Sequence, residues 1–576
     1  MKKIQNIAIA AAMVPVVLFS SCSNDFFDRT PETAMDTEVV LSDPSLVPST
    51  VVGTMAMMYS AGAWGRDLTV VGDVMTDLVS TIRSNQGTMR DIEQWIITTS
   101  STDAASYWAG PYQIAASAAR TVEAAKRLLA DSASLNETEI TNLNSAIAAS
   151  LTIKVLCEYT LAQFFCVDYN LTDVPGNNPT KVGLILLRDR ALNTDEPANM
   201  SSLEDSYTFM EQEIAEAIER FEAVGGTFTL QVSQDTRFYP TLGAAYMVQA
   251  RVYLAQHQYQ EALTAVENAL ANLPSGAQAE LITTEEALVD AYGETPSSED
   301  IWLLNYTTQD NLSANSLNTL FDSYGFSPTK YAVDLFNGTD IRSALYGGWP
   351  DGVQPSEESS SWCLKYPADN GVFNVPVLRV PELYLMKAEC QAAMNDVASA
   401  RTTLIENLIS KRDTVIDMDN YSNYEAYSDL AGTEWKSGYD NNGVAEGFLA
   451  GLLKEYTREL LCEGQRWSTL RRNGVSLNRN GSATNDEQFR SHFLQYPVSR
   501  FSFPVPFVEF TTQQWIDGRP IDLNGKFIPG QNANWQTNAW DKPNGQDYSP
   551  QIELPQDGYD YNNRNDQAGT PMATAK

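Results

Sequence analysis

The feature that most constrains the fold of this chain is a series of long helical stretches between residues 45 and 275. Their apolar residues recur at steps of three and four positions, as in Ile114, Ala118 and Val122. This spacing places apolar side chains on one face of an α-helix. The same pattern recurs in three further stretches, residues 139–166, 203–223 and 240–272. The sequence therefore predicts a mainly helical body.

One pair of these helices carries the spacing of a tetratricopeptide repeat. Seven of the eight marker positions of that repeat are matched, and Gln249 is the departure. The matching residues are Tyr246, Ala250, Tyr253, Ala262, Val266, Ala269 and Pro274. A second, looser copy consists of Tyr384, Ala388, Ala400 and Leu404, for which a generic helical hairpin is the alternative. Small residues at these positions let paired helices approach each other, so we expect two hairpins of this type.

The composition is strongly acidic, with 38 Lys and Arg against 73 Asp and Glu, a formal net charge of −35. No basic field is left for nucleic acid or for an anionic membrane surface. The two histidines, His257 and His492, form no metal-binding pattern, which leaves transition-metal and Ser-His-Asp chemistry poorly supplied. Chemistry by carboxylates alone stays open. No calcium-binding loop motif is present, and we expect neither a metal nor a cofactor.

The N-terminus resembles a bacterial lipoprotein signal. Lys2 and Lys3 precede an apolar stretch, residues 7–19, that is too short to span a bilayer. Two serines then lead to Cys22, the expected site of lipidation, and Asp25 follows in the manner of a surface-export signal. An ordinary secretory signal with a chance cysteine is the alternative. We expect no other segment to be apolar enough to cross a membrane.

Five cysteines remain, an odd number that does not suggest a disulfide framework. Most lie in helical patterns and should be small core residues. They are Cys157, Cys166, Cys363, Cys390 and Cys462. Between the two repeats, residues 275–380 are rich in Ser, Asn, Gly, Pro and aromatic residues and should form long loops. We expect a further loop at 411–445, a helix at about 446–472, and irregular structure after 475.

Five ordered motifs resemble one known family, the RagB/SusD family of surface glycan-binding lipoproteins. The longest, EYTRELLCEGQRW at residues 455–467, is similar to the family's "E.R.EL.FEG.RW" pattern, although Cys462 replaces Phe. The other motifs are DFFD at 25–28, the Asp340, Arg342 and Lys365-Tyr366 segment, RVPELYLMKAE at 379–389, and Tyr496-Pro497 with FPVP at 503–506.

The resemblance implies a mainly α, SusD-like fold, in which tetratricopeptide-type hairpins form a right-handed superhelical body covered by long loops and little strand. It also implies an outer-membrane lipoprotein on the extracellular face that captures oligosaccharides for a SusC-like TonB-dependent transporter, without catalysis. The expected divisions are a signal peptide 1–21, a lipidated tether 22–44, a helical region 45–275, a ligand-binding region 276–380, a second helical region 381–475 and a C-terminal cover 476–576.

Sugar sites combine aromatic platforms with polar side chains at their edges. Two segments supply that chemistry, one before the helix that carries Trp108 and one in the central loops. The expected ligand-binding residues are Trp95, Arg83, Asn85, Tyr324, Trp349 and Trp362. Trp535 and Trp540 are alternatives in the C-terminal cover.

Three other interpretations stay open at this point. Seven charged residues could be catalytic, but the spacing of the first four along one helix favours ion pairs that tie it to the C-terminal cover. They are Glu455, Arg458, Glu459, Glu463, Arg466, Arg471 and Arg472. The repeats could bind a peptide or protein cargo in the same kind of uptake complex. A surface glycosidase is the third possibility, although no nucleophile motif is recognisable.

Overall fold

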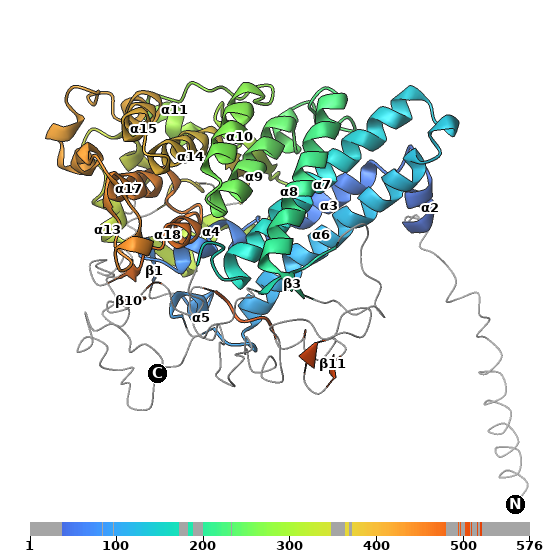
Figure 1. Cartoon of the computed structure of the whole chain (residues 1–576), viewed down its shortest axis with the longest axis horizontal. Coiled ribbons are helices and arrows are strands. Elements are labelled where there is room, and N and C mark those ends of the chain that lie inside the picture. The colour runs from blue at the N-terminus through green and yellow to red at the C-terminus, as the bar shows by residue number, and fades with distance from the viewer. Residues whose placement is uncertain are drawn as a thin grey trace, which may run out of the picture.

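The computed structural model describes the chain from Thr37 onward, and α-helices dominate it (Figure 1). The described residues are 37–82, 85–95, 97–171, 182–187, 200–231, 233–346, 363–367, 371–479 and short stretches between 493 and 520. Cys22 and the lipoprotein signal, His492, and the aromatic residues Trp349, Trp362, Trp535 and Trp540 lie outside these ranges.

The principal helices agree closely with the stretches expected from the sequence. They are α2 (Thr37–Ser42), α3 (Ser49–Met58), α4 (Asp67–Val74), α5 (Arg90–Glu93), α6 (Thr102–Leu129), α7 (Glu137–Phe165), α8 (Leu203–Ala223), α9 (Leu242–Ala255), α10 (Tyr259–Ala271), α11 (Glu285–Asp290), α12 (Leu317–Thr319), α13 (Lys330–Val333), α14 (Val380–Ala393), α15 (Val397–Leu404), α16 (Ser410–Arg412), α17 (Phe448–Leu460) and α18 (Arg466–Arg472). Short 3₁₀ turns and two π-helical segments, η5 (Leu320–Tyr324) and η7 (Ile405–Ile409), connect them.

All strands in the described part of the chain are short and pair in antiparallel twos. They are β1 (Val79–Thr81) with β5 (Phe326–Pro328), β2 (Val182–Ile185) with β3 (Met200–Ser202), β4 (Asp300–Asn305) with β6 (Asn374–Arg379), β7 (Trp435–Lys436) with β8 (Glu446–Gly447), β9 (Leu477–Asn478) with β10 (Phe493–Leu494), and β11 (Trp515–Ile516) with β12 (Arg519–Pro520). The expected mainly α architecture with little strand is confirmed.

Helices α6 to α10 lie side by side in sequence order, and α14 and α15 continue the array (Figure 1). Local signals in the sequence start several of them. Asn136 and Glu139 form a reciprocal capping box at the first turn of α7, and the Thr241 side chain caps α9. Pro381 occupies the first turn of α14, where its missing N–H leaves no helical hydrogen bond unmade.

The two repeat-like units are adjacent in space although about a hundred residues separate them in the chain. Helix α10 of the first unit packs against α14 of the second. Ala250 and Ala388, the small residues expected at close helix contacts, are both fully buried. Arg251 on α9 also donates to both carboxylate oxygens of Glu382 on α14, at 2.8 and 2.6 Å. Apolar packing and a buried ion pair therefore hold the two units together.

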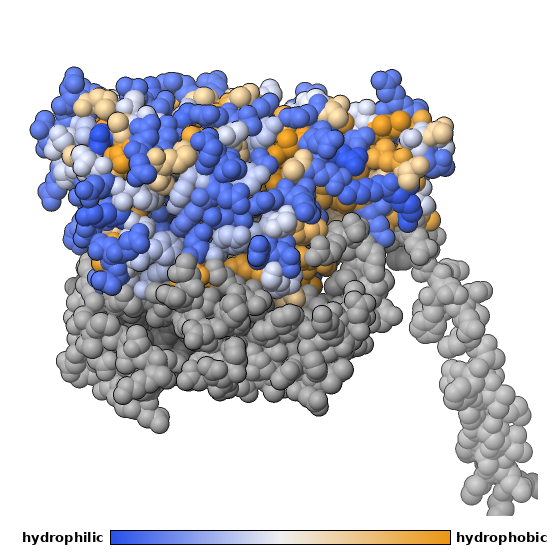
Figure 2. All heavy atoms as spheres, in the orientation of Figure 1, coloured by the Kyte–Doolittle hydropathy of each residue, from blue (hydrophilic) through white to orange (hydrophobic). Residues whose placement is uncertain are grey.

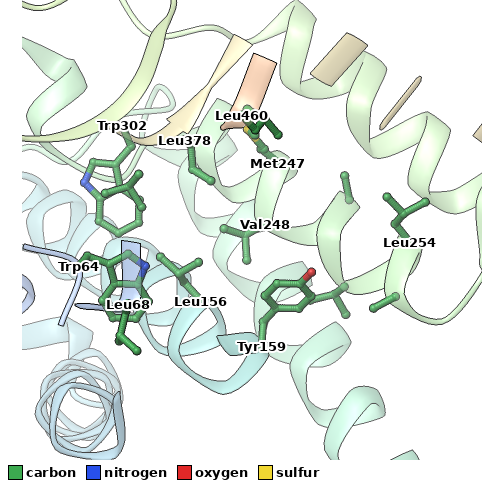
Figure 3. Packing of buried hydrophobic residues seen from close by; sticks show 14 of the residues in the cluster. Trp64, Leu68, Leu156, Tyr159, Met247, Val248, Leu254, Trp302, Leu378 and Leu460 are labelled. Carbon is green, nitrogen blue, oxygen red and sulfur yellow. The ribbon is translucent and has the colours of Figure 1, made fainter. Parts of the chain in front are cut away.

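The core is continuous along this array. Figure 3 shows Trp64 and Leu68 facing Leu156 and Val248, so that the first helices pack against α7 and α9. All five cysteines expected in the core are buried and form no disulfide.

Helix α7 is long and apolar enough to cross a membrane by length and composition, contrary to the expectation from the sequence. Within its most apolar part, 78% is buried inside the protein. Neighbouring helices cover it on several sides, which explains its apolar sequence as that of a core helix.

The single helix expected at 446–472 is in fact two helices, α17 and α18. The chain turns between them at Cys462 and Gly464, whose φ angles are 68° and 71°. Gly464 lies directly against α4, and a Cβ atom built there would be 2.5 Å from the Thr69 carbonyl oxygen. The backbone N–H of Arg466 donates to the buried Asp73 carboxylate at 3.1 Å. Helix α4 therefore occupies the break and caps α18 from a distant part of the chain.

The charged residues of α17 belong to a buried ion network, as expected, but their partners are different from those expected. Glu459 accepts hydrogen bonds from Arg342, Arg379 and Arg412 at 3.0–3.2 Å. Glu463, in the turn after α17, accepts from Lys365 and Arg379. In the described part of the chain these partners come from residues 342–412 and not from the C-terminal cover. Each of these carboxylates is paired, which supports a structural role for the motif.

Candidate functional site

The two segments expected to bind a ligand are neighbours in the structure. Strand β1 precedes the first segment and pairs with β5 in the central block, with Thr81 opposite Phe326. The side-chain amide of Asn85 donates to the carbonyl oxygen of Gly325 at 3.1 Å. The chain therefore brings residues near 85 and residues near 325 to one place beside α4 and α5 (Figure 1).

Trp95 does not offer a platform in this arrangement, contrary to the expectation from the sequence. Its side chain is only 1% exposed, and its Nε1 donates to the Met75 carbonyl oxygen at 2.8 Å. The guanidinium carbon of Arg479 lies 4.2 Å from the centre of the Trp95 ring system. Because protein covers the indole, its role in this structure is packing.

Asn85 is also used within the protein. Its amide donates to the carbonyl oxygens of Thr88 and Gly325, and its side-chain oxygen accepts from the backbone N–H of Gly87. The residue is 7% exposed. These bonds hold the turn in place, so Asn85 positions the site and does not present free polar atoms to a ligand.

Tyr324 is the one expected ligand-binding residue that is described and partly exposed. It ends the π-helical segment η5, and its hydroxyl donates to the Ala314 carbonyl oxygen at 2.7 Å. Trp302 and Tyr306, in the same block, are buried. Arg83, Trp349 and Trp362 lie beyond what the structure describes, and their roles stay predictions.

Tyr324 acts electrostatically on Arg66, which belongs to a group of polar side chains that we call the Arg66 cluster. It consists of Arg66, Asp67, Asp103, Tyr107, Asn315 and Tyr324. Arg66 immediately precedes α4, and its Nε donates to Asp67 at 2.6 Å. Its Nη1 is 3.5 Å from the Asn315 side-chain oxygen.

Two members of the cluster come from the first turns of α6. Asp103 and Tyr107 are four residues apart, so both side chains lie on one face of that helix. Tyr107 interacts electrostatically with both Asp67 and Asp103, which places its hydroxyl group near these carboxylates. The carboxylate and the phenol at the start of α6 therefore interact electrostatically with Asp67 at the start of α4.

The electrostatics of the cluster disfavour negative charge. Burial raises the pKa of Asp67, and Arg66 opposes that rise. Burial also raises the pKa of Asp103, and the neighbouring carboxylates of Asp67 and Asp91 raise it further. The cluster thus holds partly desolvated acids around one guanidinium.

This arrangement suits hydrogen bonding to a polyol. A carboxylate accepts from hydroxyl groups, a guanidinium donates to their oxygens, and the face of Tyr324 can pack against C–H groups, whereas the Tyr107 hydroxyl is covered by protein. No motif in the sequence singles out Arg66, Asp67, Asp103 or Tyr107. A usable signal was the pair of polar residues Asp103 and Tyr107 at helical spacing, at the start of an otherwise apolar and small-residue helix face.

Comparisons with known proteins agree with this architecture. The model of the SusD family matches residues 365–567. No curated protein matches the chain.

Solved structures with the same fold come from Bacteroides. A SusD superfamily protein of Bacteroides vulgatus is 19% identical, with a TM-score of 0.65, over 81% of this chain and 97% of its own. A SusD superfamily protein of Bacteroides thetaiotaomicron is 17% identical, with a TM-score of 0.65, over 82% and 99%. A SusD-like carbohydrate binding protein of Bacteroides vulgatus is 16% identical, with a TM-score of 0.62, over 82% and 99%. Residues 365–567 therefore match the model of the SusD family, and the chain has the same fold as these SusD superfamily proteins.

Proposed function

We propose that this protein captures oligosaccharides or polysaccharides outside the cell and delivers them to a SusC-like TonB-dependent transporter, without chemistry of its own. The SusD family match of residues 365–567 is the observation that carries this proposal. The solved carbohydrate-binding protein with the same fold supports it.

The Arg66 cluster is the proposed centre of glycan contact. It lies where the two predicted ligand-binding segments meet, and Tyr324 gives it an aromatic face. Trp349 and Trp362 are proposed to extend that face, because they belong to the central loops that adjoin Tyr324 in the chain. Such contacts bind by stacking and hydrogen bonds, so release to a transporter needs no covalent step.

Membrane attachment is proposed to depend on Cys22. The resemblance of residues 1–22 to a lipoprotein signal supports lipidation of this thiol and an outer-membrane location on the extracellular face. A Cys22→Ala variant expressed with its own signal should lose lipid labelling and should partition out of the detergent phase. Unchanged partitioning would contradict the anchor.

Affinity gels test glycan capture directly. The lipid-free chain that starts at Ser23 would be run through native gels containing plant, fungal or host polysaccharides, and the same mixtures would be assayed for new reducing ends. We expect retardation by at least one glycan and no release of sugar. Release would identify an enzyme, whereas no retardation by any glycan would overturn glycan capture and favour a peptide cargo.

A matched pair of variants tests the place of binding. Tyr324→Ala removes the half-buried aromatic ring of the cluster, and Tyr421→Ala removes a tyrosine that is also half-buried from η8 (Tyr421–Asn423), outside the cluster. We expect Tyr324→Ala to weaken retention about tenfold, since an aromatic contact contributes about 0.5–1.5 kcal/mol beyond area burial. Tyr421→Ala should bind like the wild type. Equal effects of the two variants would place the site elsewhere.

Delivery to a transporter is tested in the native membrane. The full lipidated chain, purified in mild detergent from its own outer membrane, should copurify with a TonB-dependent transporter. Recovery of the chain alone under several mild detergents would contradict that partnership.

A further inference from the structure

The segment at residues 82–95 contains two of the expected ligand-binding residues, Arg83 and Asn85. Its helix α5 has four residues, too few for the segment's own hydrogen bonds to fix its shape. Its described side chains include exposed polar residues and buried apolar ones. Exposed are Gln86, Arg90 and Asp91, and buried are Met89, Ile92 and Trp95. Other parts of the protein therefore hold this segment in place.

One residue of the C-terminal part of the chain, Arg479, binds both this segment and α4. Its Nε donates to the Thr76 carbonyl oxygen at 2.8 Å, and its Nη2 donates to that of Val74 at 3.1 Å. Its Nη1 donates to the carbonyl oxygen of Glu93. Val74 ends α4 and Glu93 ends α5, so one guanidinium satisfies carbonyl groups at the ends of two helices.

The guanidinium of Arg479 also covers Trp95. Its central carbon lies 4.2 Å from the centre of the indole, a distance at which a cation is attracted to an aromatic face. Trp95 has a φ angle of 56°, in the left-handed region that bulky residues rarely adopt. Such a conformation persists only where the surroundings fix it. Arg479 is 2% exposed, so water does not replace its bonds, and the end of the segment depends on this side chain.

We propose that Arg479 is a positioning residue of the candidate ligand-binding site. It ties residues 85–95 to the end of α4, and Asn85 in turn contacts the central block through the carbonyl oxygen of Gly325 at 3.1 Å. The inference rests on the proposed glycan capture and gives a residue of the C-terminal cover a role in it. Arg479 acts through the backbone of the segment and not by touching the glycan. A site that is correctly shaped for only part of the time binds with an affinity reduced by that fraction.

Hydrogen exchange of Arg479→Lys tests the positioning itself. Lysine keeps the charge, but its single ammonium lacks the planar fork that reaches three carbonyl groups. We expect the protection of amides at residues 85–95 to fall about tenfold or more, with α9 and α17 unchanged. This measurement needs no glycan. Unchanged protection at 85–95 would overturn the inference.

Arg401→Lys is the matched control. Arg401, on α15, donates to the carbonyl oxygens of Leu430 and Gly432, both at 2.7 Å, and lies 5.9 Å from the centre of the Phe448 ring. It therefore makes the same kinds of contact in a part of the array that lies apart from α4 and α5 (Figure 1). Arg401→Lys should leave the exchange of residues 85–95 as in the wild type. An equal loss of protection there in both variants would show a general loosening and would refute the special role of Arg479.

Calorimetry with oligosaccharides of the glycan retained in the affinity gels connects the positioning to binding. Arg479→Lys should weaken affinity about fivefold or more, and Arg401→Lys should not change it. Unchanged affinity in Arg479→Lys would remove Arg479 from the site and leave glycan capture standing. If the wild type binds no glycan, the proposed function fails, whereas hydrogen exchange still decides whether Arg479 positions the segment.

Trp95→Phe perturbs the same contact more gently and replaces Arg479→Lys if that variant does not fold. Phenylalanine keeps an aromatic ring beside the guanidinium but loses the hydrogen bond from Nε1 to the Met75 carbonyl oxygen. Protection at residues 85–95 should fall about threefold or more, since a hydrogen bond that helps to fix the segment is lost. Equal protection in Trp95→Phe and in the wild type would contradict the inference.

Discussion

At the scale of single residues, the protein buries some of its many carboxylates, and Asp73 is one of them. Asp73 is fully buried on α4, and one of its oxygens accepts the backbone N–H of Arg466. Its other oxygen has no partner among the described residues. Burial raises the pKa of Asp73 from 3.8 to about 7, although the neighbouring N–H groups oppose the rise. The folded protein therefore holds a proton on Asp73 that the unfolded chain would release.

Asp73→Asn should change the pH dependence of stability. Because the folded pKa lies above the unfolded one, the contribution of Asp73 is fully present below pH 3.8 and is lost as pH rises through about 7. Relative to Asp73→Asn, the wild type should lose about 1.4 kcal/mol of unfolding free energy per pH unit across this window. Denaturant titrations of both proteins at several pH values measure the difference. Parallel pH profiles would show that Asp73 is ionised in the folded state.

Trp95→Ala should behave as a core mutation. The side chain fills a buried position and its Nε1 holds the Met75 carbonyl oxygen, so truncation should cost about 3–5 kcal/mol of unfolding free energy. Chemical denaturation measures this loss. A Trp95→Ala protein that is fully stable but no longer binds glycan would restore the role in ligand binding that the sequence suggested.

At the scale of elements, the contact between α4 and the turn before α18 decides how the two ends of the chain meet. Gly72 lies at the closest point, where a Cβ atom would be 1.9 Å from the Gly464 carbonyl oxygen. The added Cβ would be attached directly to the backbone of α4, and the Gly464 carbonyl is itself backbone. Neither atom can move without displacing the main chain. The geometry requires glycine on α4 at the cost of helix propensity.

Gly72→Ala should therefore destabilise the protein by at least about 2 kcal/mol, as overpacking in a core does. Gly53→Ala, in the middle of α3, is the control because nothing lies within 4 Å of its added Cβ. That control should be neutral or stabilising by about 0.5–1 kcal/mol, since alanine favours a helix. Thermal melts of the two variants should move in opposite directions, and equal shifts would contradict the close approach.

The ion network of α17 makes a second prediction at this scale. Burial opposes charge on Glu459, but the guanidinium groups of Arg412, Arg379 and Arg342 hold its pKa below the usual value. Glu459→Gln leaves three buried cations short of a partner and should cost about 3–5 kcal/mol. Asp334→Asn, which breaks the exposed pair with Lys330, should cost less than about 1 kcal/mol. Comparable losses would mean that the buried network is no more important than a surface pair.

At the scale of the whole molecule, two contributions to stability oppose each other. Repulsion among the excess negative charges destabilises the fold, and the hydrophobic core that runs through the described chain stabilises it. The face of the helical array in Figure 2 is largely hydrophilic, with scattered apolar spots. A net charge of −35 repels itself across such a surface, and salt screens this repulsion within about 10 Å at 0.1 M. Buried pairs such as Arg251 and Glu382 are screened far less.

The melting temperature should therefore rise by about 1–3 °C between 10 mM and 0.3 M NaCl. Differential scanning calorimetry at fixed pH checks the direction. A fall in melting temperature with salt would mean that attractive surface pairs outweigh the general repulsion.

Local features of this chain could be predicted from the sequence, whereas contacts between distant segments could not. Periodic apolar residues and capping signals predicted α6 to α10 closely, because a helix is specified by neighbours three and four positions apart. The motif of α17 indicated buried ion pairs for the same reason. The continuous helix at 446–472 was a wrong prediction, since the break is imposed by α4, nearly 400 residues away in the chain.

The sequence by itself determined the helical class of this protein, its repeat-like pairs, its buried cysteines and its family resemblance. These properties depend on local spacing and on ordered motifs. Only the tertiary structure decided that Trp95 is buried, that Asn85 holds a turn, and that the Tyr107 hydroxyl is buried without a hydrogen-bond partner among the described residues. Burial and pairing depend on which distant segments meet, and local sequence carries little information about those encounters.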